Sequence, residues 1–306
     1  DIGACPDVFG PLAELMDVVN VPADRATLAN LLPQFDFYCA AIGVPVERAL
    51  MERASRLKAI VTVSTGLDHI DLECAAARGI EVLSLRGETA FLDSVTSTAE
   101  AAFGLLLSVA RRLPAASAAA ARGEWARERF RGHQLSGMTL GVLGYGRLGR
   151  MMAEYGRAFR MRVLACDVKP VEAPDWVSMV PLERLLEESD AVSIHVHLTP
   201  ETRRLIDARA IARMKPGAIL INTSRGAIVD ETALLAAIEQ GHLAGAGLDV
   251  IDGELGEDVT QHPVIRYARK HENVVVTPHI GGVTLEAQAA AFRYMVTKFA
   301  RWFKAR

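Results

Sequence analysis

Residues 141–150 read Gly-Val-Leu-Gly-Tyr-Gly-Arg-Leu-Gly-Arg, an apolar stretch that runs into the spacing Gly144-x-Gly146-x-x-Gly149. Gly144 permits a tight turn, Gly146 lets the backbone approach a pyrophosphate, and Gly149 lets the following helix pack closely on the strand. The first N–H groups of that helix would face the phosphates. The pattern predicts a dinucleotide-binding strand–turn–helix unit. The residues expected to contact a cofactor here are Gly144, Tyr145, Gly146, Arg147, Leu148 and Gly149.

An acidic residue, Asp167, closes the next apolar run, Arg162–Cys166, about twenty residues after the glycines. A carboxylate at this position would accept hydrogen bonds from the adenosine ribose hydroxyls and would repel a 2′-phosphate. The expected cofactor is therefore NAD rather than NADP.

Composition excludes several classes of protein. The chain has 306 residues, half of them hydrophobic, which suffices for a large core and for two domains. A formal charge of -3 offers no basic footprint for nucleic acid, and the apolar run at 101–110 is too short to span a membrane. The cysteines lack Cys-x-x-Cys spacing and are Cys5, Cys39, Cys74 and Cys166. They favour a reducing compartment, hence the cytoplasm, and argue against a disulfide framework or a metal site.

Strand and helix patterns alternate along the chain. In the first part, strands are expected at Met16–Val21, Phe37–Ile42, Ala59–Val63 and Glu81–Leu85, and helices at Asp24–Leu32, Val46–Arg53 and Asp71–Arg78. A helix is expected at Ser97–Arg112. After the glycine motif, strands are expected at Ala191–His195, Ala218–Asn222, Gly245–Val250 and Val274–Thr277, helices from near Leu182, Asp207 and Asp230, and a last helix at Thr284–Lys304. This pattern predicts an α/β protein with a six-stranded doubly wound parallel sheet and a smaller parallel sheet.

An arginine, an acid and a histidine follow three of the predicted strands, where ligands of doubly wound sheets collect. Arg225 can bind a carboxylate through its two-point fork and polarise an adjacent carbonyl. His279 can exchange a proton near neutral pH. Glu254, placed against the imidazole, would favour its protonated form and fix its tautomer. Beside a nicotinamide, the three residues would support hydride transfer.

Each residue of this trio also has a purely structural interpretation. A single arginine in a loop is usually a surface residue, and His279 could cap a helix. Glu254 could be solvated in an acidic turn with Asp252 and Glu257. The occurrence of all three residues after strand ends favours the catalytic interpretation.

Six stretches of the chain together resemble the D-isomer-specific 2-hydroxyacid dehydrogenase family. They are residues 65–71, Ser97-Thr98-Ala99-Glu100, residues 141–149, residues 214–230, residues 245–254 and residues 277–282. The resemblance implies that Arg225, Glu254 and His279 are catalytic, with Arg225 and His279 also touching the substrate. It further implies that backbone amides of the loop Thr65-Gly66-Leu67 hold the substrate carboxylate. The further cofactor contacts that it implies are His195, Thr202, Thr223, Asp249 and Gly281.

The same resemblance implies a domain organisation. Residues 96–283 would form a Rossmann-type NAD-binding domain. Residues 1–95 and 284–306 would form a smaller flavodoxin-like substrate domain, and the nucleotide domains would join two copies into a homodimer. His197 stands where relatives usually carry proline, and its role is left open.

Departures from the family pattern bear on the substrate. The loop Ala40–Pro45 lacks the cation that relatives use to meet the phosphate of 3-phosphoglycerate. A non-phosphorylated 2-oxo acid of the glyoxylate or hydroxypyruvate kind is therefore expected, although Arg86 could reach the distal end of a phosphorylated substrate. Thr65 replaces the lysine of phosphite-oxidising relatives, and Glu254 replaces the glutamine of formate-oxidising ones. Leu255 replaces a usual proline.

Two alternatives remain beside this expectation. One is D-3-phosphoglycerate dehydrogenase activity. The other, of a different class, is a non-catalytic NAD-sensing scaffold like the transcriptional corepressors of the same fold. A panel of 2-oxo acids with NADH discriminates between an enzyme and a scaffold.

Overall fold

The structure, a computed structural model, describes residues 7–22, 24–256 and 258–306. Cys5 and Glu257, which the sequence analysis considered, lie outside the described residues. The chain divides into two compact units. Unit 1 combines Asp1–Val95 with Val283–Arg306, and unit 2 is Thr96–Gly282.

Unit 2 is built on a parallel sheet in the order β10-β9-β8-β7-β4-β5-β6. Its strands are β4 (Thr139–Leu143), β5 (Arg162–Cys166), β6 (Val177–Met179), β7 (Ala191–Ile194), β8 (Ile219–Asn222), β9 (Gly245–Leu248) and β10 (Val274–Val276). The strand order reverses beside β4, as the doubly wound expectation requires. The described sheet has seven strands where six were expected, because the edge strand β6 is only three residues long and leaves no readable periodicity.

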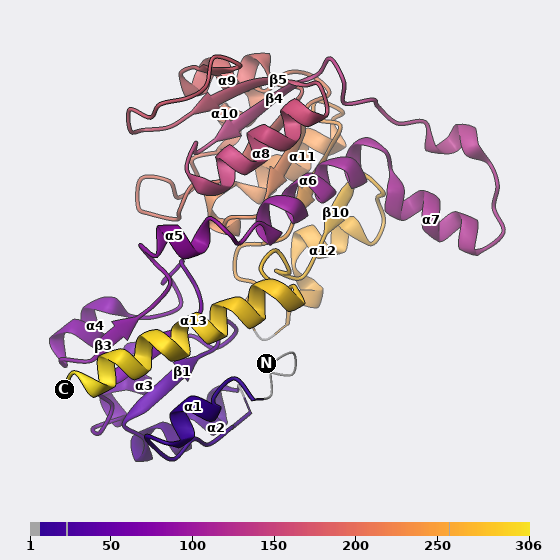
Figure 1. Ribbon diagram of the computed structural model, residues 1–306. Coiled ribbons are helices and arrows are strands. Elements are labelled where there is room, and N and C mark those ends of the chain that lie inside the picture. The colour runs from indigo at the N-terminus through magenta and orange to yellow at the C-terminus, as the bar shows by residue number, and fades with distance from the viewer. Residues whose placement is uncertain (1–6, 23, 257) are drawn as a thin grey trace. The chain divides into compact units, whose positions relative to one another are not determined.

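Helices cover both faces of this sheet (Figure 1). The helices of this unit are α6 (Ser97–Ala110), α7 (Leu113–Ala121), α8 (Arg147–Ala158), α9 (Leu182–Glu188), α10 (Ala208–Arg213), α11 (Glu231–Glu239) and α12 (Pro263–Ala268), with 3-10 turns η2 (Arg127–Phe130), η3 (Gly226–Ile228) and η4 (Val259–Gln261). Helices α6 and α8 share one apolar core with the sheet, and α9 to α12 share the other. The starts expected near Asp207 and Asp230 are confirmed, because both carboxylates cap their helices by accepting backbone N–H bonds.

Unit 1 contains a three-stranded parallel sheet in the order β1-β2-β3. Its elements are β1 (Phe37–Ala40), β2 (Ala59–Thr62), β3 (Glu81–Leu83), α1 (Gly10–Ala13), α2 (Arg25–Leu31), η1 (Leu32–Gln34), α3 (Arg48–Arg53), α4 (Leu72–Ala77), α5 (Thr89–Leu92) and α13 (Leu285–Lys304). One core joins α2, α3 and α4 to Ile60. The other joins α1, α5 and α13 to Val61. Successive residues of β2 thus point to opposite faces, as a strand requires.

The strand expected at Met16–Val21 is wrong. The chain turns after α1 and then runs without regular structure through these residues. Val18 and Val19 are exposed, and no strand among the described residues pairs with them. A strand needs backbone partners as well as β-forming side chains, and this segment has none.

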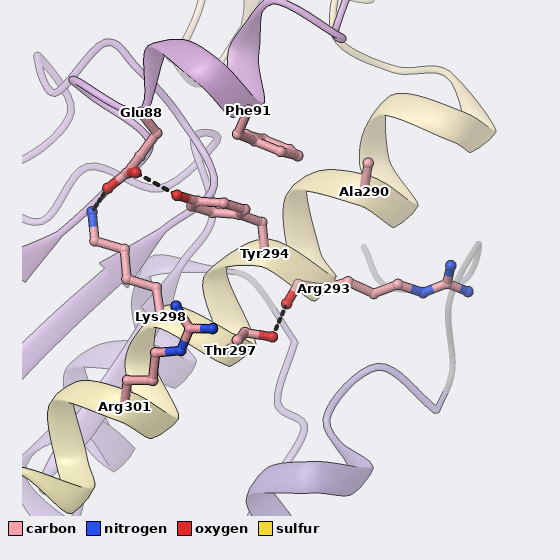
Figure 2. A pocket seen from close by; sticks show the side chains of 8 residues that line it. All are labelled: Glu88, Phe91, Ala290, Arg293, Tyr294, Thr297, Lys298 and Arg301. Carbon is pink, nitrogen blue, oxygen red and sulfur yellow. Dashed lines mark hydrogen bonds and ion pairs between the residues drawn. The ribbon is translucent and has the colours of Figure 1, made fainter.

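Helices α5 and α13 are joined by a small polar and aromatic cluster (Figure 2). Lys298 Nζ lies 2.5 Å from Glu88 Oε1 and 2.8 Å from the carbonyl oxygen of Ser84. The hydroxyl of Tyr294 donates to the other oxygen of Glu88, and the Tyr294 ring stacks on Phe91 with centroids 4.3 Å apart. These contacts hold the short helix α5, which is too short to be stable alone.

Glu88→Gln is expected to lower the melting temperature by about 2 °C at neutral pH, a typical scale for one ion pair. Hydrogen bonds from Lys298 and then Tyr294 hold the pKa of Glu88 below its usual range. The stabilisation is therefore present above the unfolded pKa of about 4.3 and is lost as pH falls through the lower folded value. Calorimetry from pH 3 to pH 7 checks this, with Glu52→Gln, an exposed glutamate, as control. The prediction would be contradicted if the melting temperatures of wild type and Glu88→Gln differed by the same amount at pH 3 and at pH 7.

Candidate active site

The glycine turn after β4 has the geometry that the sequence predicts. Gly144 has a φ of +93°, and a Cβ there would lie 2.7 Å from the backbone oxygen of His195. A Cβ on Gly149 would lie 2.0 Å from the backbone oxygen of Gly144. Both positions therefore require glycine. A Cβ on Gly146 would meet no atom within 4 Å, so open space lies where the sequence analysis puts a pyrophosphate.

Asp167 is attached to this turn by hydrogen bonds. Its Oδ2 accepts the backbone N–H of Tyr145 at 2.9 Å, and its Oδ1 accepts that of Lys169 at 3.0 Å. The Tyr145 side chain is buried in the core, so this residue offers only its backbone to a ligand. Gly146 is the N-cap of α8 and provides no side-chain cap, which leaves first-turn N–H groups for an anion. The open space, the uncapped helix and the placed carboxylate fit a dinucleotide.

His195 directly follows β7 beside the glycine turn. Its Nε2 lies 2.8 Å from the hydroxyl of Ser193, and its buried Nδ1 has no hydrogen-bond partner among the described residues. Burial lowers the pKa of His195 to about 4. The ring of His195 is therefore neutral at physiological pH.

Two threonines of the predicted cofactor set have different surroundings. Thr223 follows β8, and its buried hydroxyl lacks a hydrogen-bond partner among the described residues. Thr202 instead uses its hydroxyl within its own loop, donating to the backbone oxygen of His197 at 2.6 Å and accepting from Thr199 N–H at 2.7 Å. Thr202 orders this loop.

His279 and Glu254 form a close pair on unit 2. His279 Nδ1 lies 2.6 Å from Glu254 Oε1, and both side chains are largely buried. The hydrogen bond that His279 Nδ1–H donates to Glu254 raises the pKa of His279, against burial and the positive charge of Arg225, which lower it. Because Nδ1 is committed to Glu254, Nε2 is the nitrogen that remains for exchange with a ligand.

The loop that carries His279 is fixed by Asp249, which directly follows β9. The buried Asp249 carboxylate accepts from the Thr277 hydroxyl at 2.5 Å and from the N–H groups of Ile280 at 2.9 Å and Gly281 at 2.7 Å. His279 itself has a φ of +53°, a left-handed conformation that is uncommon for a residue with a Cβ. Its N–H donates to the backbone oxygens of Asp249 and Thr277. Asp249 and Gly281, predicted to contact the cofactor, thus also position the histidine.

Arg225 is placed by the turn that follows β8. The side-chain amide of Asn222 donates to the Arg225 carbonyl at 2.9 Å, and its oxygen accepts the N–H of Ser224 at 3.0 Å. The Ser224 hydroxyl then donates to the Ile194 carbonyl at the end of β7, at 2.9 Å. The sequence analysis missed Asn222 and Ser224, for which a buried asparagine that ends a strand is the only available signal.

The other predicted substrate residues, Thr65, Gly66 and Leu67, lie in unit 1 after β2. Ser64 Oγ donates to the Gly66 carbonyl at 2.7 Å, and Arg86 Nε donates to the Thr65 carbonyl at 3.3 Å. The role of this loop in binding a carboxylate stays a prediction.

The described residues form neither a metal site nor a membrane-spanning helix. Over these residues, no group of three or more His, Cys, Asp or Glu side chains is arranged to hold a metal ion. No described helix has the length and apolar character needed to cross a membrane.

The fold and this site define a nicotinamide-dependent oxidoreductase, and comparison with known proteins identifies its family. The model of the D-isomer specific 2-hydroxyacid dehydrogenase NAD binding domain matches residues 103–281. Hydroxypyruvate reductase of Thermotoga maritima is 36% identical over 90% of this chain and 87% of that protein. The chain belongs to the D-isomer-specific 2-hydroxyacid dehydrogenase family, and its cofactor is NAD.

Two further relatives bear on the substrate. D-3-phosphoglycerate dehydrogenase of Mycobacterium tuberculosis is 38% identical over 94% of this chain, which spans only 53% of that protein. The crystal structure of D-lactate dehydrogenase from Aquifex aeolicus, complexed with NAD and lactic acid, matches with a TM-score of 0.82 at 30% identity, covering 99% of this chain and 94% of that one. Relatives with different substrates thus share the family, so similarity alone leaves the substrate unassigned.

Asp167→Asn is expected to reduce the preference for NADH over NADPH by about tenfold, the scale of one nearby charge. Asparagine keeps an oxygen that can accept the Tyr145 N–H and removes the charge that would repel a 2′-phosphate. Fluorescence titration of both cofactors measures this, with Asp175→Asn, outside the glycine turn, as control. Equal NADH and NADPH affinities in the wild type would show that Asp167 does not face the ribose.

Proposed function

We propose that this protein transfers a hydride between nicotinamide and C2 of a small, non-phosphorylated D-2-hydroxy acid or 2-oxo acid, such as glyoxylate or hydroxypyruvate. Arg225, Glu254 and His279 are the proposed catalytic residues. The contact of 2.6 Å between His279 Nδ1 and Glu254 Oε1 is the observation that carries the proposal. It prepares a histidine for proton transfer at the carboxyl edge of a dinucleotide-binding sheet.

The proposed chemistry divides among the three side chains. Bound NADH supplies the hydride for reduction of the 2-oxo acid. His279 Nε2 gives a proton to the carbonyl oxygen of the substrate. Glu254 keeps the imidazole protonated and oriented, and Arg225 binds the carboxylate and polarises the carbonyl with its guanidinium fork. In unit 1, the backbone N–H groups of Thr65-Gly66-Leu67 are the proposed donors to a substrate carboxylate.

The absence of cations from the sequence Ala40–Pro45 supports a non-phosphorylated substrate. The name of the Thermotoga maritima relative, hydroxypyruvate reductase, is consistent with it. One observation favours the alternative, 3-phosphoglycerate: Arg86 Nε donates to the Thr65 carbonyl at 3.3 Å, which places a guanidinium beside the proposed substrate loop. The substrate panel below separates these two possibilities.

We also propose a cytoplasmic homodimer joined through unit 2. Helix α7 extends away from the sheet of this unit (Figure 1), buries only Ala119, and is followed by Trp125, whose side chain is 85% exposed. These features suit a surface that a second copy covers. Light scattering tests the proposal, because a monomeric mass would contradict it.

A panel of 2-oxo acids tests the function. NADH absorbance should fall with glyoxylate or hydroxypyruvate, and the product of hydroxypyruvate should have the D configuration. His279→Asn should lower kcat by about two to four orders of magnitude, the usual contribution of a positioned acid or base, and NADH binding should persist. His271→Asn is the matched control. Loss of NADH only with 3-phosphohydroxypyruvate would favour the alternative, and no turnover with any member would refute the proposal.

Glu254→Gln should shift the pH dependence of reduction. The Glu254 carboxylate raises the pKa of His279, so the imidazolium persists to higher pH in the wild type. With glutamine, the alkaline limb of the pH–rate profile should move to lower pH by about one unit, and part of the activity should return in acid. A uniform loss of rate without a shifted limb would mean that Glu254 does not tune the histidine.

A further inference from the structure

Glu254 itself is weakly held by its own turn, although Gly256 N–H donates to the Gly253 carbonyl at 2.8 Å. Asp252 and Gly253 are exposed, and Gly253 has a φ of +78°. Within the turn, Glu254 N–H donates to the Ile251 carbonyl at 3.3 Å, and Glu254 Oε2 accepts the Ile251 N–H at 3.4 Å. Both bonds are long for N–H···O contacts. Contacts from outside the turn are therefore needed to keep Glu254 against His279.

Two side chains from other elements hold the backbone of Asp252. Glu231, the first residue of α11, accepts the Asp252 N–H at 2.9 Å. His262, the N-cap of α12, has its Nε2 3.0 Å from the Asp252 carbonyl oxygen. His262 Nε2 also lies 3.4 Å from Glu231 Oε2, and only 16% of the His262 side chain and 11% of the Glu231 side chain are exposed. The two peptide groups of Asp252 are thus each bound by a buried side chain.

The hydrogen bonds of His262 define its tautomer. Its Nδ1 accepts the backbone N–H of Val264 at 3.3 Å, so Nδ1 carries no proton while this bond is made. In the neutral ring the proton then resides on Nε2. That Nε2–H donates to the Asp252 carbonyl, which gives the contact a defined direction.

The loop that carries Arg225 packs closely against the same turn. A Cβ on Gly226 would lie 2.0 Å from the carbonyl carbon of Ile251 and 2.1 Å from the nitrogen of Asp252. Backbone therefore packs on backbone at this point. Glu231 begins α11 five positions after Gly226, beyond the 3-10 turn η3. A single segment thus contacts the Ile251–Asp252 peptide by close packing and by a side-chain hydrogen bond.

We propose that Glu231 and His262 are positioning residues that clamp the Asp252 backbone and so hold Glu254 on Nδ1 of His279. Neither residue needs to touch substrate. The two side chains of the clamp come from the starts of α11 and α12. The clamp thus joins the segment that runs from Arg225 to Glu231 to the turn that carries Glu254. The role of the clamp in catalysis rests on the proposed function, whereas its effect on the pKa of His279 does not.

The charge of Glu231 also affects the pair formed by Glu254 and His279. Burial, together with the negative charges of Asp252, Glu254 and Asp230, raises the pKa of Glu231 to about 7. His262, from α12, is the basic group that faces it. Ionisation of Glu231 near neutral pH adds a negative charge near Glu254, which favours the imidazolium of His279. Removal of the charge alone is expected to have a smaller effect than loss of the anchor.

NMR titration of the His279 ring tests the clamp without reference to turnover. The full chain is labelled at histidine, and the His279 signal is assigned from its absence in His279→Asn. Glu231→Ala and His262→Ala should lower the pKa of His279 by about one unit, approaching Glu254→Gln. Glu231→Gln and His262→Gln keep an acceptor and a donor near the native positions, and should shift it by about 0.3 unit or less.

Controls make the result decisive. Glu239→Gln removes an exposed carboxylate at the other end of α11 and should leave the His279 titration unchanged. If Glu231→Ala does not fold, Glu231→Asp serves instead. The aspartate keeps the charge but is too short to accept the Asp252 N–H, so this variant should still shift the His279 titration. A His279 pKa equal to that of the wild type in the alanine variants or in Glu231→Asp would overturn the clamp. A His279 pKa that shifts as far in the glutamine variants as in the alanine variants would also overturn it. A shifted titration in a protein that reduces no 2-oxo acid would retain the clamp and refute the proposed function.

Discussion

Every neighbouring pair of strands in the seven-stranded sheet is parallel, and the site depends on this constraint. Parallel strands bring all their carboxyl ends to one edge of the sheet. The glycine turn follows β4, Asp167 follows β5, and His195 follows β7. Arg225, Glu254 and His279 then follow β8, β9 and β10, which are adjacent strands. Residues more than 130 positions apart in the chain are gathered at this edge by strand direction and order.

Buried polar groups turn this rough placement into defined geometry. The Asp249 carboxylate, only 1% exposed, would be costly to bury without hydrogen-bond donors. It obtains them from the Thr277 hydroxyl and the N–H groups of Ile280 and Gly281. Satisfying this one charge fixes the loop in which His279 adopts its left-handed backbone. Asn222 fixes the turn of Arg225 in a similar way, because its side-chain amide donates to the Arg225 carbonyl and its oxygen accepts the Ser224 N–H.

Two histidines at the same sheet edge have opposite electrostatic surroundings. Burial lowers the pKa of His195 to about 4. The Glu254 carboxylate raises the pKa of His279, and this effect outweighs burial. The ring beside the glycine turn therefore has a lowered pKa, while the ring at the proposed reaction centre has a raised one. This separation of two chemically identical side chains resembles the way that active sites assign different roles to like groups.

The sequence by itself determined the features that repeat or act locally: the glycine turn, the alternation of strands and helices, the helix starts near Asp207 and Asp230, and the order of Arg225, Glu254 and His279 after strand ends. It failed at Met16–Val21, because strand formation depends on a partner that no local pattern reveals, and at β6, which is too short to show a period. Only the tertiary structure decided which groups satisfy one another, such as Asp249 with Gly281, or Glu231 and His262 with the Asp252 backbone. Those contacts depend on distances between elements far apart in the chain, and packing of the whole unit, not local residue preference, sets such distances.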